Sequence, residues 1–227
     1  MKTVFLIPGY GLPKNIKPDE NYNIYLKSVF NTIWDLTVKN KIVKPLIILS
    51  GGKTDCFKPY QRTEAEEMAK IFKPLIQRTR IKSQTRGWQV ALEKKSLSTL
   101  ENLLFCRDIL RKKKINSGQL YVFCEMTRQE RMKILARKVL GKKFKIKVWA
   151  VDFDHSQNRY LDPKFISKKE KAGTKFALGA LKSPAKFQEH HRVFVKKFKF
   201  LRQHDPAKHP QAVKKWMTEQ MKILEGK

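Results

Sequence analysis

The chain has 227 residues, of which 50 are Lys or Arg and 20 are Asp or Glu, so its formal net charge is +30. This length fits one large domain or one domain with an appendage, and a hydrophobic content of 41% excludes wholesale disorder. No apolar run approaches the roughly 18 residues that a membrane-spanning helix needs, which excludes such a helix.

The positive charge is spread along the whole chain. Residues 1–100, 101–150 and 151–227 hold 18, 14 and 18 basic residues against 8, 4 and 8 acidic ones, so each part has a net charge of +10. Such a surface attracts nucleic acid and other polyanions. A solvated lysine-rich surface with no partner explains the same composition.

Short apolar segments alternate with segments of helical periodicity in the first 151 residues. Strands are predicted at 2–7, 45–49, 88–92, 119–124 and 145–151, and helices at 23–39, 63–72, 98–112 and 127–140. This alternation is typical of βαβ units with a parallel sheet and helices on both faces. Three of the helices begin with the S/T-x-x-E pattern of a capping box, namely Thr63 to Glu66, Ser98 to Glu101 and Thr127 to Glu130.

The remaining residues follow a different pattern. A polar loop is predicted at 152–163, and three helices are predicted at 167–181, 184–202 and 207–224. We therefore divide the chain into an α/β domain at 1–151 and a basic helical extension at 152–227 that packs on it.

Unusual residues collect where the predicted strands end. They are Gly9 and Gly11; Ser50, Gly51 and Gly52; Glu93, Ser96, Thr99 and Asn102; and Arg128 and Arg131. Ligands of open parallel sheets bind beyond the carboxyl ends of the strands. Glycine turns bring backbone N–H groups close to a ligand, and arginines bind phosphate or carboxylate. These residues predict an anion site, although each glycine turn alone is also explained as a tight turn and each arginine as solvated surface.

The acidic residues divide into two groups. Capping explains Glu66, Glu101 and Glu130, but it does not explain Glu64 or Glu93, which become the candidate catalytic residues.

No metal site is predicted. The best local cluster, Asp152 with Asp154 and His155, is a weak candidate, and Cys124 has no histidine base fixed beside it. The three cysteines are widely spaced, and the apolar run before Gly9 is too short for a secretory signal, so we expect reduced thiols and a cytoplasmic protein.

Taken together, residues 1–151 resemble the YdcF-like domain of the SanA/ElyC/YdcF family. The similarity runs through Pro8-Gly9-Tyr10-Gly11, Leu49-Ser50-Gly51-Gly52 and Thr63-Glu64-Ala65 to the most specific segment, Glu93-x-x-Ser96-x-x-Thr99-x-Glu101-Asn102. The family usually carries His-x-x-Arg after the fourth strand, where this chain has Arg128 and Arg131.

The resemblance implies a Rossmann-like three-layer α/β/α fold with five mainly parallel strands in the order 3-2-1-4-5. It implies a pocket lined by the strand-end residues named above, and S-adenosylmethionine as a ligand. Arg128 in place of the family histidine favours anion binding over proton transfer.

Two functions follow from these patterns. The first is binding of a nucleotide-like or phosphorylated small molecule at the strand ends, with or without a reaction. The second is a catalytically silent basic scaffold for nucleic acid or another polyanion. The sequence fixes neither the substrate nor the oligomeric state.

Overall fold

The computed structural model describes residues 2–152, 163–205 and 208–225. Its centre is a five-stranded, all-parallel sheet in the order β3-β2-β1-β4-β5, which confirms the predicted fold class and strand order. The strands are β1 (Thr3–Pro8), β2 (Leu46–Ser50), β3 (Gln89–Glu93), β4 (Gly118–Glu125) and β5 (Phe144–Val151).

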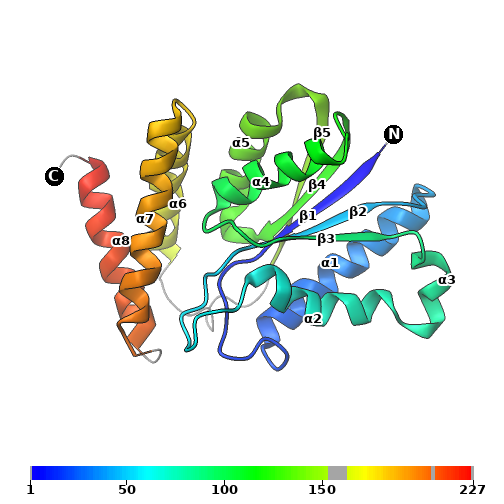
Figure 1. Cartoon of the computed structure of the whole chain (residues 1–227), viewed down its shortest axis with the longest axis horizontal. Helices are drawn as coiled ribbons and strands as arrows, with labels where there is room; N and C mark the ends of the chain where they lie inside the picture. Colours follow the sequence, from blue (N-terminus) through cyan, green and yellow to red (C-terminus); the bar gives the residue numbers. More distant parts are fainter. Residues whose placement is uncertain (1, 153–162, 206–207, 226–227) are drawn as a thin grey trace.

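Helices cover both faces of the sheet (Figure 1). They are α1 (Glu20–Lys39), α2 (Glu64–Ile76), α3 (Lys82–Thr85), α4 (Thr99–Lys112) and α5 (Gln129–Leu140), with three short 3₁₀ turns, η1 (Thr79–Ile81), η2 (Met126–Arg128) and η3 (Gly141–Lys143). Every residue of β1 and β2 is buried, whereas β5 alternates between partly and largely exposed residues. Inner strands of a parallel sheet are apolar on both sides because helices pack on both.

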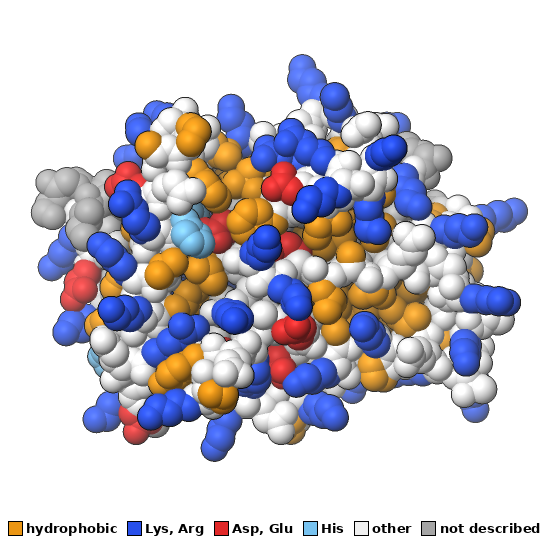
Figure 2. Space-filling view, in the orientation of Figure 1, with side chains coloured by type: hydrophobic (Ala, Val, Ile, Leu, Met, Phe, Trp, Pro, Cys, Tyr) orange, Lys and Arg blue, Asp and Glu red, His pale blue; other side chains and the backbone are white. Residues whose placement is uncertain are grey.

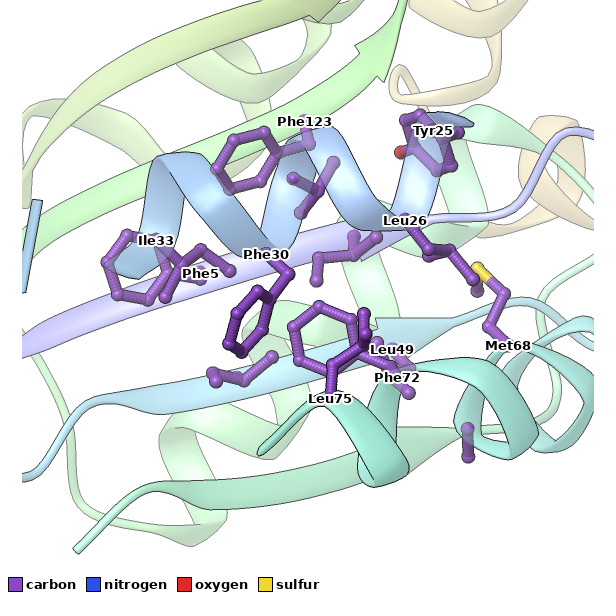
Figure 3. Packing of buried hydrophobic residues seen from close by; sticks show 14 of the residues in the cluster. Phe5, Tyr25, Leu26, Phe30, Ile33, Leu49, Met68, Phe72, Leu75 and Phe123 are labelled. Carbon is purple, nitrogen blue, oxygen red and sulfur yellow. The ribbon is translucent and has the colours of Figure 1, made fainter. Parts of the chain in front are cut away.

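Successive residues of each inner strand point to opposite faces of the sheet and belong to two separate hydrophobic cores. Phe5 and Leu49 pack with Phe30 of α1 and Phe72 of α2, as Figure 3 shows. The strand residues between them, such as Leu6 and Ile48, point to the opposite face and pack with α4 and α5.

The three C-terminal helices, α6 (Pro163–Ala180), α7 (Pro184–Arg202) and α8 (His209–Glu225), stand together beside the carboxyl ends of the strands, at the left of Figure 1. Ala177 and Ala180 of α6 are buried in the core of the α4 and α5 face. The helical extension therefore lies at the sheet edge where ligands of this architecture bind.

Most differences from the predicted elements are shifts of a few residues at their ends. Helix α1 begins earlier than predicted because the Asp19 side chain caps it, accepting a hydrogen bond from Tyr22 N. Helix α2 continues through Pro74 to Ile76, where the prediction ended at Phe72, because Leu75 is buried in the core. The short η1 and α3 segments were not predicted.

One predicted helix start is wrong. Helix α5 begins at Gln129, and Thr127 lies in the preceding 3₁₀ turn, where its N–H and hydroxyl both donate to Glu125. The carboxylate of Glu125 thus takes the hydrogen bonds that a capping box would have used. The other two predicted caps form, with Thr63 accepting from Glu66 N and Ser98 from Glu101 N.

Candidate functional site at the carboxyl ends of the strands

Four loops at the carboxyl edge of the sheet are held together by hydrogen bonds between them. Gly9 N donates to Ser50 O over 2.8 Å, and Gly51 N donates to Glu93 O over 2.9 Å. Arg128 Nη1 lies 3.4 Å from Gly9 O. The predicted residues that follow β1, β2, β3 and β4 therefore meet along one edge.

The glycine N–H groups have partners within the chain. Besides the two bonds above, Gly52 N donates to Ser96 O over 2.7 Å and Gly11 N donates to Glu64 Oε1 over 2.6 Å. The expectation that these N–H groups donate to a bound anion is therefore not supported, and side chains have to supply the donors.

Glu64 explains two of the glycines. A Cβ atom at Gly9 would lie 2.6 Å from Glu64 Oε2, and a Cβ at Gly51 would overlap both that oxygen and Glu64 Cβ. Glycine at both positions leaves space for the carboxylate. Burial raises the pKa of Glu64, while the hydrogen bond from Gly11 N and the charge of Arg128 act in the opposite direction.

Glu93 is the centre of a buried hydrogen-bond network. Its Oε1 accepts from Lys95 N over 2.6 Å and from Ser96 N over 3.0 Å. Its Oε2 accepts from Ser50 Oγ over 2.7 Å and from Ser96 Oγ, and Asn102 contacts both serine hydroxyls. Because each carboxylate oxygen already accepts two hydrogen bonds, Glu93 holds the loop between β3 and α4 in place.

Arg131 connects the α/β domain to the helical extension. Its Nη2 donates to Thr99 Oγ1 over 2.7 Å, and its Nε lies 3.0 Å from Glu170 Oε2 on α6. A Cβ at Gly173 would lie 2.8 Å from Arg131 Nη1, so the absence of a side chain there lets α6 come close. Arg131 thus contacts α4 and α6 from its place on α5.

The extension brings two further cations to Arg128 and Arg131, and the sequence reasoning missed both. Lys169 of α6 pairs with Glu170 over 3.0 Å. Lys197 of α7 is influenced by the charges of Lys169, Arg128 and Arg131. Burial, reinforced by these like charges, lowers the pKa of Lys197 to about 8. In the sequence, both lysines lie in basic runs that look like ordinary surface.

Lys197 has no ion pair with a carboxylate among the described residues. Its Nζ lies 5.5 Å from the ring centroid of Phe198 and 5.9 Å from that of Phe194, both on its own helix. These rings offer only a weak attraction compared with an anion. We name Arg128, Arg131, Lys169 and Lys197 the rim cluster.

A second contact between the α/β domain and the extension involves Glu101, whose side chain is fully buried. Its Oε2 accepts from Leu97 N over 2.7 Å, and its Oε1 lies 3.1 Å from His191 Nδ1 and 3.9 Å from His190 Nδ1. His190 is buried between Phe176 and Phe194. Glu101 therefore holds α7 against the α/β domain through its side chain, while its backbone N–H donates to the capping residue Ser98 of α4.

We expect acid to destabilise the protein through His190. Burial, with the charges of Arg131 and His191, lowers the pKa of His190 to about 4. The unfolded chain therefore binds more protons between about pH 6.5 and pH 4, so stability falls as the pH falls through that range. The contribution of His190 is complete above pH 6.5, and its loss reaches about 3 kcal/mol at most.

Urea unfolding of wild type and His190→Phe between pH 4 and pH 7 tests this. As the pH falls, the wild type should lose more free energy of unfolding than the variant does. Burial raises the pKa of Glu101, which acts in the opposite direction, but Glu101 is present in both proteins. Parallel stability curves would show that His190 carries no such dependence.

Other candidates are settled by burial or lie outside the described residues. Burial raises the pKa of the Cys124 thiol to about 12, so it is protonated at neutral pH. Of the weak metal cluster only Asp152 is described, since Asp154 and His155 fall in 153–162. In the described part of the chain, no three His, Cys, Asp or Glu side chains are placed to hold a metal ion.

Comparison of the chain with protein-family models, curated proteins and solved structures gave no match. The similarity to the YdcF-like domain therefore stays a prediction. Within the described residues, no helix has both the length and the apolar character needed to cross a membrane.

Proposed function

We propose that the protein binds a small anionic molecule, nucleotide-like or phosphorylated, at the carboxyl ends of β1 and β4. The observation that supports this most is the rim cluster, in which four cationic side chains from η2, α5, α6 and α7 lie close enough for their charges to lower the pKa of Lys169 and Lys197. The strand order β3-β2-β1-β4-β5 places β1 and β4 at the topological switch point, where open parallel sheets bind ligands.

The charges at the rim cluster are unequal. Three nearby carboxylates offset part of the charge. Glu170 lies beside Arg131 and Lys169, Glu125 Oε2 lies 3.6 Å from Arg128 Nε, and the charge of Glu64 also acts on Arg128. Four cations against three carboxylates leave one excess positive charge that an anion would neutralise. An arginine guanidinium forms paired hydrogen bonds with phosphate, and a lysine adds a point charge.

The remaining predicted residues take different parts in this proposal. Glu93 holds the β3–α4 loop through its hydrogen bonds, which fits a positioning role better than direct chemistry. Glu64 lies beside Gly11 and Arg128, where its carboxylate would accept a hydrogen bond from a sugar hydroxyl. S-adenosylmethionine, which the YdcF-like resemblance implies, offers only its carboxylate to the rim cluster, so phosphates are the better match.

Ligand-induced stabilisation tests the proposal. We expect ATP, AMP, a sugar phosphate or S-adenosylmethionine to raise the melting temperature, by about 5–10 °C at a hundred times the dissociation constant. Lys197→Met should abolish at least half of this shift, because it removes a rim cation that has no carboxylate partner. Lys196→Met, at the exposed neighbouring position, is the matched control and should keep the full shift.

Two outcomes would refute the proposal. One is that none of the probes stabilises the wild type at millimolar concentration. The other is that Lys197→Met and Lys196→Met respond alike. Only the shift caused by the ligand is compared, since Lys197→Met changes the stability of the free protein by removing a partly buried charge.

The alternative proposal, a scaffold for nucleic acid or another polyanion, is supported by the surface. Lys and Arg side chains are distributed over the whole face in Figure 2. On β5, Lys145, Lys147 and Trp149 alternate on one side of the edge strand and are exposed. Binding of an oligonucleotide that weakens steeply with salt, and that survives Lys197→Met, would favour this alternative.

A further inference from the structure

We propose a second binding site, next to the rim cluster, that takes a nucleotide through its phosphate and its base. The site is an open cavity of about 720 Å³ where the loop between β2 and α2 meets the end of α7. Its lining comes from the loop after β1, the loop after β2, and the last turn of α7 with the residues that follow it, and it includes Lys14, Phe57, Lys58, Tyr60, Arg62 and Arg202. The volume lies within the usual range of small-molecule sites.

Arg202 gives the cavity a fixed positive charge. Its Nε donates to Asp55 O over 2.9 Å, and its Nη2 donates to Lys53 O over 3.0 Å. Its guanidinium also lies over the ring of Tyr60, 5.3 Å from the centroid. These partners orient the guanidinium without neutralising it, since Arg202 has no ion pair with a carboxylate in the described ranges.

Arg62 contrasts with Arg202 and shows which cations remain for a ligand. Its Nη2 lies 2.8 Å from Asp55 Oδ1, and its Nη1 donates to Lys14 O over 2.9 Å, so its charge is already paired. Lys14 and Lys58 are exposed at the cavity and form no ion pair with the described carboxylates. Together with Arg202 they exceed the single acidic lining residue, Asp205, which suits a phosphate.

Aromatic rings provide the second half of the recognition. Phe57 and Tyr60 line the same cavity within a few residues of Lys58. Tyr60 has a φ of 63°, in the left-handed region that non-glycine residues rarely adopt, and its hydroxyl donates to Arg202 O over 3.1 Å. A ring held beside unpaired cations is the arrangement that binds a base by stacking and its phosphate by charge.

The nucleotide could come from two sources, a free nucleotide or one nucleotide of a single-stranded nucleic acid. Titration calorimetry with AMP and with a 12-residue single-stranded DNA separates them. A free-nucleotide site binds AMP, and it binds the DNA no more tightly than AMP. A nucleic-acid site binds the DNA at least tenfold more tightly than AMP, with a steep dependence on salt.

The test variant is Lys14→Ala with Lys58→Ala, both at exposed positions, so the fold should be retained. We expect it to weaken binding at this site at least tenfold. The control is Lys17→Ala with Lys53→Ala, which removes the same charge from exposed positions in the same two loops but outside the cavity lining, and should leave binding within about twofold. Phe57→Leu should also weaken binding, because it removes a ring and keeps an apolar side chain.

Lys169→Met separates the two proposed sites, because Lys169 interacts with Arg128 and Arg131 of the rim cluster, whereas the charge of Lys197 also acts on the cavity residue Cys56. The Lys169→Met variant should leave cavity binding unchanged, whereas the cavity variant should leave the ligand-induced stabilisation at the rim cluster unchanged. The cavity proposal is overturned if neither AMP nor the DNA binds at millimolar concentration, or if the cavity and control variants weaken binding equally. It is also overturned if all AMP binding disappears with Lys169→Met, which would assign AMP to the rim cluster alone.

Discussion

Glu93→Ala is expected to lower the free energy of unfolding by about 3–5 kcal/mol, one of the two largest effects in the molecule. The variant leaves two backbone N–H groups without their buried acceptor, and the two serine hydroxyls keep only Asn102 as a partner. Glu93→Gln should lie between the variant and wild type, since one amide oxygen still accepts. Urea unfolding at neutral pH measures all three proteins.

Glu130→Ala is the matched control for Glu93→Ala. Its side chain is 76% exposed and pairs only with Lys133, so its loss should change stability by less than about 0.5 kcal/mol. If Glu93→Ala is instead as stable as wild type or more so, the carboxylate is held at a cost to stability, as a catalytic group is. Such a result would contradict a positioning role for Glu93.

Gly51→Ala is expected to cost about 3 kcal/mol, because the added methyl group meets the Glu64 side chain at its Cβ and its carboxylate. The Cβ of Glu64 is fixed by helix α2 and cannot turn aside, so the turn after β2 has to shift. Thermal or urea unfolding gives the loss of stability. The same shift would displace Glu64 from Gly11, and the ligand-induced stabilisation at the rim cluster should weaken as well.

Gly179→Ala provides the comparison. Its added methyl group meets nothing within 4 Å, and the position lies within α6, so the change should be neutral or stabilise by up to about 1 kcal/mol. If Gly51→Ala behaves like Gly179→Ala, the turn after β2 is free to move and Glu64 does not explain the glycine.

The architecture of the α/β domain could be predicted because its sequence signals are local. The inner strands are short apolar runs, and Ser98 and Thr63 cap their helices as the pattern indicates. The third cap failed because the pattern Thr127 to Glu130 does not record Glu125, two residues upstream, which competes for the same donors. A pattern of four residues contains no information about such a competitor.

The candidate site was predicted in part. Residues at the ends of four strands do meet along one edge, as their positions in a parallel sheet require. The use of the glycine N–H groups could not be foreseen, because it depends on Glu64 and on carbonyl groups from neighbouring strands. Lys169 and Lys197 could not be found either, since nothing local distinguishes them from the exposed lysines beside them.

Glu170 connects ligand binding at the rim cluster with the attachment of α6 to the α/β domain. It reaches from α6 to Arg131 and also pairs with Lys169, so the anion that we propose and the extension would share the same positive partners. Thermodynamic reciprocity then requires that whatever the anion does to the attachment of α6, the attachment does to the anion by an equal free energy. Release of the C-terminal helices from the α/β domain and release of the anion from the rim cluster would then be coupled events, and either one could be measured to follow the other.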